Sequence, residues 1–205
     1  MVNELIGATL QILVFTLIPF LVYTIKNKST TGFFEYIGLK RSTKKANYLA
    51  VFACLIFATP VLLLTLTSVD FKEIMFDPAS ITGKFRQMGF GMYSVSTLLI
   101  VALFKTSFAE EILFRGFVAK RLISVMGYQK GNMLQATLFG IIHTALFASI
   151  TSNAFFLLVI FIVPSIGAYV SVYLNEKLAS GSIVPGWISH GLANVLAYSI
   201  VGFII

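Results

Sequence analysis

Long apolar stretches separated by short polar segments dominate the chain of 205 residues. Each stretch is about 20 residues long, the length at which a helix crosses roughly 30 Å of hydrocarbon. The six stretches cover residues 5–25, 46–68, 91–118, 133–150, 153–174 and 183–205. The pattern predicts an all-α fold, a polytopic membrane helix bundle with about six transmembrane helices. No repeat or linker interrupts it, so we expect one transmembrane domain over residues 1–205.

The composition supports a membrane location. Hydrophobic residues make up 58% of the chain and charged residues only 11%, against roughly 25% charged residues in soluble domains. The net charge of +7 comes from basic residues between the apolar stretches, where cytoplasmic loops carry them. We therefore expect the lipid bilayer, and no nucleic acid, as a partner. The single cysteine, Cys54, allows neither a disulfide framework nor a cysteine-based zinc site within one chain.

The distribution of basic residues predicts an orientation. Residues 26–45 contain six basic and one acidic residue, whereas residues 69–90 contain three of each. By the positive-inside rule the first of these loops is cytoplasmic, together with the turns that carry Lys120 and Lys177. The first stretch lacks a basic n-region and a cleavage site, so it is expected to be a retained helix. We predict a multi-pass protein of the cell membrane whose N-terminus lies outside.

Two adjacent acidic residues end the third stretch. A charged side chain at the centre of a membrane helix costs roughly 2.5–3.5 kcal/mol on insertion scales. Glu111 precedes Arg115 by four residues, the favourable order for an ion pair on one helix face. That pair alone would serve as a structural clamp. Glu110 points about 100° away from Glu111 around the helix and needs other neighbours or a function.

Both histidines of the chain also fall in predicted membrane helices. His143 lies in an apolar helix, and His190 and Asn194 are spaced to share one helix face. Each could simply form hydrogen bonds between helices. However, Glu110, His143 and His190 have similar predicted heights, roughly 10–15 Å from the cytoplasmic surface. We therefore predict one cavity that opens toward the cytoplasmic half.

A carboxylate and two imidazoles are suited to the activation of water. Either the glutamate acts as a general base, or glutamate and histidine together hold a zinc ion that activates the water. The amide of Asn194 can donate a hydrogen bond to the oxyanion that develops when water attacks a carbonyl group. Together these groups can hydrolyse a peptide bond. The His-Glu-x-x-His helix of common zinc peptidases is absent.

Three short motifs, which follow one another along the chain, resemble those of the CPBP family. They are Glu110-Glu111-x-x-x-Arg115, Phe139-x-x-x-His143 and His190-x-x-x-Asn194, each on a separate predicted helix. The family contains CAAX prenyl endopeptidases of the Ras-converting type, bacteriocin-processing and self-immunity proteins, and Abi proteins. The resemblance covers residues 94–205, which would form the catalytic core.

The resemblance implies an intramembrane peptidase in which Glu110 activates water and Asn194 stabilises the oxyanion. His143 and His190 would assist, or would bind zinc together with Glu110; a glutamate peptidase would need no cofactor. The supporting residues would be Glu111, Arg115 and Phe139.

The expected activity is that of an endopeptidase acting on a membrane-associated or apolar peptide or protein. The chain is shorter than eukaryotic CAAX endopeptidases, which favours leader peptides, secreted peptides or membrane proteins as substrates. An alternative is a non-proteolytic immunity or scaffold membrane protein of the same family. A transporter is disfavoured, because Pro19, Pro60 and Pro164 form no repeat of broken helices.

Overall fold

The computed structural model describes all 205 residues, and every regular element is a helix. Each of the six predicted stretches is helical, which confirms the all-α fold class. The elements are α1 (Val2–Asn27), α2 (Phe33–Tyr36), α3 (Lys44–Thr67), α4 (Val69–Phe76), α5 (Ile81–Met88), α6 (Met92–Leu99), η1 (Ile100–Phe108), η2 (Glu111–Ala119), α7 (Lys120–Met126), α8 (Tyr128–Ala148), α9 (Ala154–Tyr173), η3 (Leu174–Leu178) and α10 (Val184–Phe203).

The third predicted stretch forms most of one continuous helix over residues 92–126, which extends eight residues beyond the predicted end. Within it, η1 and η2 are π-helical, and the junction residues Ala109, Glu110 and Lys120 keep right-handed helical backbone angles. Long π-helical segments are rare, and π-bulges in α-helices occur mainly at functional sites. This wider winding sets the directions of the two adjacent glutamates.

Side-chain donors support the widened helix. The carbonyl oxygens of residues 101–103 each accept a hydrogen bond from a side chain. Thr106 Oγ1 donates to the first at 2.9 Å, Ser107 Oγ donates to the second, and Trp187 Nε1 donates to the third at 2.7 Å. These bonds satisfy backbone acceptors that the lipid could not satisfy.

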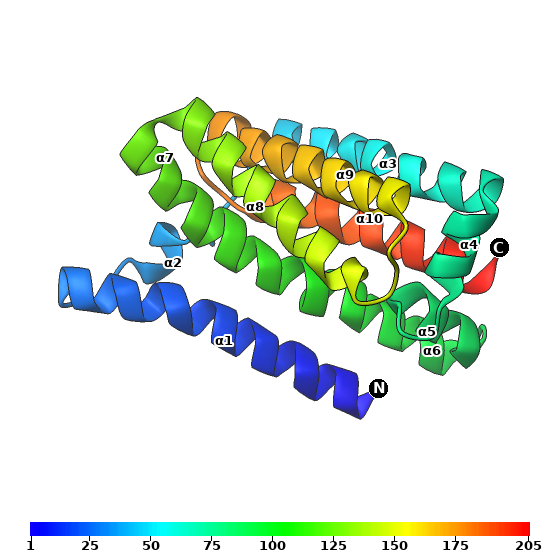
Figure 1. The fold of residues 1–205 in the computed structure, drawn as a ribbon. Helices are drawn as coiled ribbons and strands as arrows, with labels where there is room; N and C mark the ends of the chain where they lie inside the picture. Colours follow the sequence, from blue (N-terminus) through cyan, green and yellow to red (C-terminus); the bar gives the residue numbers. More distant parts are fainter.

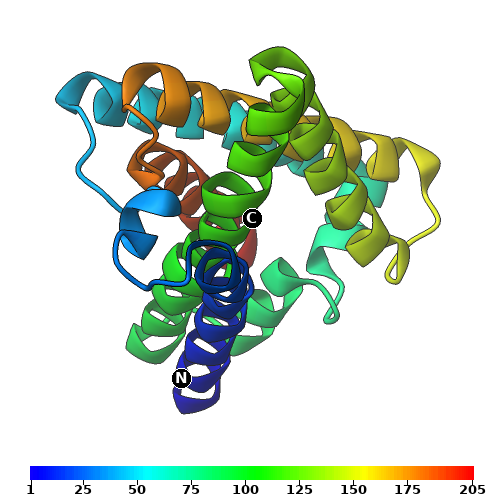
Figure 2. The same cartoon turned by 90° about the vertical axis from the view of Figure 1, so that its left-hand side faces the viewer.

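The helix α10 lies at the centre of the bundle. It contacts α3, α5, α9 and η1, while α8 packs along α9. The first helix, α1, lies beside η1 and η2 on the outside of the bundle (Figures 1 and 2). An apolar cluster of Phe71, Met75, Phe156, Ile160 and Val201 joins α4, α9 and α10. The site helices are thus held by apolar packing on several sides.

Three helices are long and apolar enough to cross a membrane: α1, α3, and α9 continued through η3 (Ala154–Leu178). The other three predicted spans carry the polar side chains of the candidate site, which lowers their hydropathy. Leu10, Leu13 and Leu17 on α1 are about half exposed, at 57%, 59% and 51%. Such apolar exposure suits contact with lipid, and the chain is a helical membrane bundle.

The bundle has two contrasting ends. We call the end formed by α2, α7, residues 28–43 and 179–183 and the adjoining ends of α1, α3, α8 and η3 the basic end, because ten of the 15 basic residues lie there (Figure 1). The other end, called the open end, is formed by α4, α5, α6 and the connection between α8 and α9, and both chain termini lie there.

Long-range hydrogen bonds fasten the basic end. Ile183 N donates to Gly38 O at 2.9 Å, which joins the two connecting segments. Lys120 Nζ donates to Glu176 Oε1 at 2.5 Å and to Gly181 O at 2.8 Å. These bonds fix the start of α10 relative to the continuous helix, and thereby the positions of its site residues.

Candidate functional site

A cavity of about 700 Å³ lies between α3, the continuous helix, α8, α9 and α10. Its size is within the range of ligand-binding pockets. Most of the predicted site residues line it. They are Glu110, Arg115, Phe139, His143, His190 and Asn194. The structure thus brings three sequence motifs from three separate helices to one cavity, which we call the site cavity.

The site cavity extends toward the open end. Its wall includes Ser80 and Ile81 before and in α5, and Ser149 and Ile150 after α8. The prediction of an opening toward the cytoplasmic half depends on the orientation of the chain in the membrane and stays a prediction. Because α8 begins at Tyr128 and not at residue 133, His143 lies 15 residues from the start of its helix, farther than the predicted ten or so.

The two adjacent glutamates have different surroundings. Glu110 lines the site cavity, its side chain is 18% exposed, and its Oε2 atom has no hydrogen-bond partner. Glu111 is fully buried, and its Oε1 atom lies 3.1 Å from Arg115 Nε. The predicted Glu111–Arg115 ion pair is thus present. Glu110 is the carboxylate that is left to face a substrate.

The buried charges of Glu111 and Arg115 are held by close packing. The guanidinium of Arg115, only 2% exposed, lies 4.0 Å from the ring centroid of Phe139, a distance that suits a cation–π interaction. On the other side of Glu111, its Oε2 atom lies against Gly186, where a Cβ atom would collide with it. Only glycine therefore allows α10 to approach this carboxylate.

His190 lies between the two glutamates. Its Nδ1 atom is 3.3 Å from Glu111 Oε1, and its Nε2 atom is 4.0 Å from Glu110 Oε2. Because a carboxylate only accepts hydrogen bonds, the first contact places the hydrogen on Nδ1 in the neutral ring. Glu111 thus orients the imidazole so that its Nε2 atom faces the cavity carboxylate.

His143 is oriented by its own helix. Its Nδ1 atom lies 2.9 Å from the carbonyl oxygen of Phe139, to which it donates, so Nε2 is the free nitrogen. The ring packs against that of Phe139 with a centroid distance of 4.3 Å, and the Phe139 ring also contacts His190 edge-on at 5.9 Å. Phe139 therefore holds both imidazoles and the guanidinium of Arg115.

The amide of Asn194 connects the site to the widened helix. Its Nδ2 atom donates to Thr106 Oγ1 at 3.0 Å and makes a longer contact of 3.4 Å with Ser107 Oγ. The hydrogen directed at Ser107 is weakly held, because 3.4 Å exceeds the usual length of such bonds. That hydrogen remains available to a negatively charged oxygen in the cavity.

The sequence interpretation missed Thr106, Ser107 and Tyr198. Tyr198 lines the site cavity together with Thr106 and Glu110. The sequence spacing did point to Tyr198, because residues 190, 194 and 198 follow one another at intervals of four on one face of α10. No sequence signal marked the two hydroxyl residues, since their role depends on the π-helical winding.

The predicted zinc ligands do not form a metal site in this arrangement. No group of three histidine, cysteine, aspartate or glutamate side chains converges closely enough to hold an ion. The nearest approach is the 4.0 Å contact between Glu110 Oε2 and His190 Nε2, and the hydrogen bond from His143 Nδ1 to Phe139 leaves His143 Nε2 free. The three side chains do not share an ion site in this arrangement, and a zinc-bound water stays a prediction.

Comparison with known proteins identifies a family. The model of the family described as Rce1-like, type II CAAX prenyl endopeptidase, matches residues 93–196, just over half of the chain. The match includes all seven predicted site residues. No curated protein and no solved structure matches the chain.

Proposed function

Because the chain belongs to the Rce1-like family of type II CAAX prenyl endopeptidases, we propose that it hydrolyses peptide bonds in the site cavity with a water activated by Glu110. Members of this family are membrane-embedded proteases of the CAAX type. The proposal also gives each site residue of this chain a role in that reaction.

The environment of Glu110 carries the proposal. It is the one carboxylate in the cavity wall that has an unpartnered oxygen, and it faces an imidazole nitrogen at 4.0 Å. The neighbouring Glu111 is neutralised by Arg115. A water between Glu110 and His190 can therefore donate one hydrogen to the carboxylate and the other to His190 Nε2.

The reaction then follows the usual course of amide hydrolysis. Glu110 takes a proton from the water, and the water oxygen forms a bond to the carbonyl carbon of the substrate. The carbonyl oxygen becomes an oxyanion. When the carbon–nitrogen bond breaks, Glu110 returns the proton to the leaving amine, which yields one new carboxyl group and one new amino group.

Three further groups assist the oxyanion and the water. The Asn194 hydrogen that points to Ser107 turns to the oxyanion, and the Tyr198 hydroxyl supplies a second donor from the next turn of α10. His143 accepts a hydrogen bond from the water or the substrate through its free Nε2 atom. Glu111, Arg115 and Phe139 position His190 and do not touch the reacting atoms.

The lining of the cavity suits an apolar peptide. Phe57, Val61, Phe147, Ile160 and Val163 form much of its wall. A segment of a leader peptide, a secreted peptide or a membrane protein can bury apolar side chains there. Such a segment would enter from the open end, where the cavity extends.

The test is cleavage of a panel of apolar peptides by the purified protein in ¹⁸O-labelled water, with products identified by mass spectrometry. Hydrolysis puts one ¹⁸O atom into the new carboxyl group. Glu110→Gln, which keeps shape but cannot take a proton, should lower kcat by about 10²–10⁴-fold. Glu73→Gln on α4, an acid outside the cavity wall, is the matched control.

Cleavage by the wild type and the control, with loss in Glu110→Gln, is the expected result. Folded wild-type protein that cleaves no member of a panel of lipidated and unmodified peptides would overturn the proposal. That outcome would instead favour the non-proteolytic immunity or scaffold function. Full activity of Glu110→Gln would overturn the assigned general base.

A further inference from the structure

The basic end has far more positive than negative charge. Its ten basic residues face two acidic ones, Glu35 and Glu176, which pair with Lys40 at 3.5 Å and with Lys120 at 2.5 Å. The other eight basic residues form no ion pair within the chain. Two helices long enough to cross a membrane, α1 and α3, have an end here. The excess charge therefore lies at the level of the lipid headgroups.

Arg121 of α7 is an unpaired cation whose position is fixed. The carbon of its guanidinium lies 3.9 Å from the centre of the Tyr36 ring, within the range of a cation–π interaction. Its Nε atom is buried and has no hydrogen-bond partner. Most buried donors in proteins have an acceptor, so the side chain is held in place while its donors lack an anion.

The aromatic ring beneath this guanidinium is itself fixed by two helices. The Tyr36 ring lies 4.7 Å from that of Tyr23 in α1 and 6.5 Å from that of Phe117 in η2, measured between centroids. The short helix α2 thus lies between α1 and the continuous helix (Figure 1). Because stacking fixes the plane of the guanidinium, little side-chain freedom is lost when an anion binds to its edge.

Exposed apolar side chains lie on the three elements that carry Arg121 and its neighbours. They include Ile25 in α1, Phe34 in α2 and Val125 in α7, which are 77%, 65% and 81% exposed. Val125 follows Arg121 by four residues and shares its helix face. A ligand with both an anionic headgroup and acyl chains matches this combination, whereas a soluble anion would use the guanidinium alone.

We propose that Arg121, stacked on Tyr36, binds the phosphate group of an anionic phospholipid, whose acyl chains lie along the exposed apolar side chains of α1 and α2. The planar guanidinium donates two parallel hydrogen bonds to phosphate oxygens. The unpaired lysines nearby attract the same headgroup over a longer range. This site lies at the end opposite to the opening of the site cavity and does not depend on the peptidase function.

The experiment titrates the purified protein in detergent with phosphatidylglycerol and with phosphatidylcholine of the same acyl chains, and counts bound lipids by native mass spectrometry. The wild type should bind phosphatidylglycerol about 10- to 100-fold more tightly, the range provided by hydrogen bonds to a charged group. Arg121→Leu should lose this preference without weaker binding of phosphatidylcholine. Arg121→Lys should restore it only in part, because lysine keeps the charge but lacks the planar fork.

Two pairs of variants separate a built site from general attraction by charge. Lys45→Met removes an exposed lysine without an ion pair from the same end, and should weaken binding by about fivefold at most. Tyr36→Leu keeps every charge but removes the ring under Arg121, and should lower the affinity for phosphatidylglycerol. Tyr36→Phe keeps the ring and should bind as the wild type does. Unfolding without added lipid shows that each variant is folded.

Equal affinity of the wild type for the two lipids would overturn the proposal. Equal losses in Arg121→Leu and Lys45→Met would also overturn it, because they would show attraction by charge without a fixed site. Glycerol 3-phosphate that displaces the lipid at equal concentration would show a site for soluble phosphate and would overturn the lipid as ligand. If Arg121→Leu does not fold, unchanged binding by Tyr36→Leu would overturn the site in its place.

Discussion

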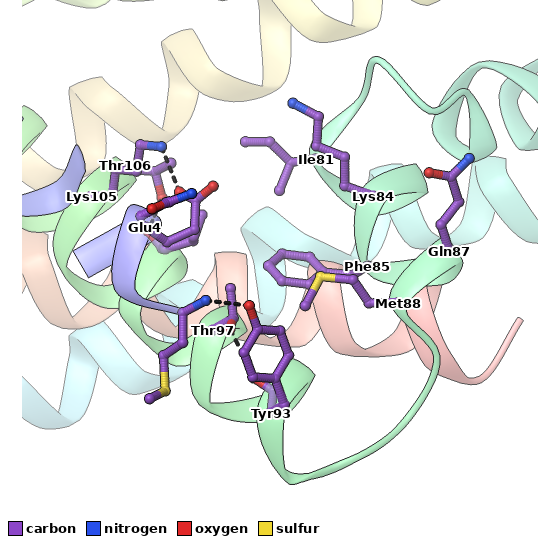
Figure 3. A pocket seen from close by; sticks show the side chains of 13 residues that line it. Glu4, Ile81, Lys84, Phe85, Gln87, Met88, Tyr93, Thr97, Lys105 and Thr106 are labelled. Atoms are coloured by element: carbon purple, nitrogen blue, oxygen red, sulfur yellow. Dashed lines mark hydrogen bonds and ion pairs between the residues drawn. The ribbon is translucent and has the colours of Figure 1, made fainter. Parts of the chain in front are cut away.

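The two ends of the bundle are built for different purposes. At the basic end, hydrogen bonds between distant segments join residues 28–43 to residues 179–183, and Lys120 joins α7 to η3. At the open end, the site cavity and a second hollow of about 490 Å³ between α1, α5, α6 and η1 (Figure 3) lie between the helices. The helices are therefore linked by hydrogen bonds at the basic end and enclose cavities at the open end.

This contrast separates stability from activity. Substitutions that loosen the basic end should lower the free energy of unfolding and affect turnover only indirectly. Substitutions in the wall of the cavity should change turnover with little effect on unfolding. The polar cluster between the two ends, in which Arg115 and Glu111 are buried, should influence both properties.

Arg115→Met should give the largest loss of stability. It should lower turnover as well, so that stability and activity are not separate at this residue. It leaves Glu111 buried without its cation, which costs about 3–5 kcal/mol for a buried ion pair. His190 would also lose its fixed orientation, so turnover should fall as well. Unfolding in detergent and peptide cleavage measure the two effects. Arg41→Met in the exposed basic segment of residues 28–43 serves as the control. Unchanged stability of Arg115→Met would contradict the claim that Arg115 stabilises the buried Glu111.

Gly116→Ala should weaken the basic end alone. A Cβ atom at this position would lie 2.5 Å from the carbonyl oxygen of Ile37, and such overpacking typically costs about 1–3 kcal/mol. Gly91→Ala at the open end, where a Cβ atom meets nothing closer than 4.0 Å, should have little effect. A thermal unfolding comparison tests the pair. Equal midpoints would contradict the close approach of Ile37 to Gly116 of η2.

Lys120→Met should give the smallest effect, a loss of about 1 kcal/mol, because it removes hydrogen bonds that are partly open to solvent. Its side chain is 12% exposed and that of its partner Glu176 is 25% exposed. Lys130→Met removes an exposed lysine from the same end and should be neutral. Denaturant titration distinguishes the two variants. A Lys120→Met variant that loses activity but keeps the stability of the wild type would contradict the proposal that the basic end serves stability.

Much of the fold could be predicted from the apolar pattern. The lengths of the six stretches predicted six helical segments, and polar residues in three of them indicated where the site lies. The motif around His190 and Asn194 was readable because residues four apart share a helix face. The pairing of Glu111 with Arg115 followed from the same spacing and is present in the structure.

What the sequence could not predict depends on helix distortion and tilt. The π-helical winding of η1 is accompanied by a hydrogen bond from Trp187 to the carbonyl group of Leu103, two residues that lie far apart in the chain. The predicted height of His143 was too low because α8 begins at Tyr128, five residues before the predicted start. The hollow between α1, α5, α6 and η1 and the contact between Glu4 and Lys105 bring together residues up to about 100 positions apart, so no local sequence pattern could predict them.

The most direct test of the account is to measure turnover and unfolding together for Glu110→Gln. The account predicts a loss of turnover of about 10²-fold or more, with a free energy of unfolding equal to that of the wild type, because Glu110 lines the cavity and its Oε2 atom has no hydrogen-bond partner to lose. Turnover equal to that of the wild type, or a loss that merely follows a loss of folded protein, would contradict it.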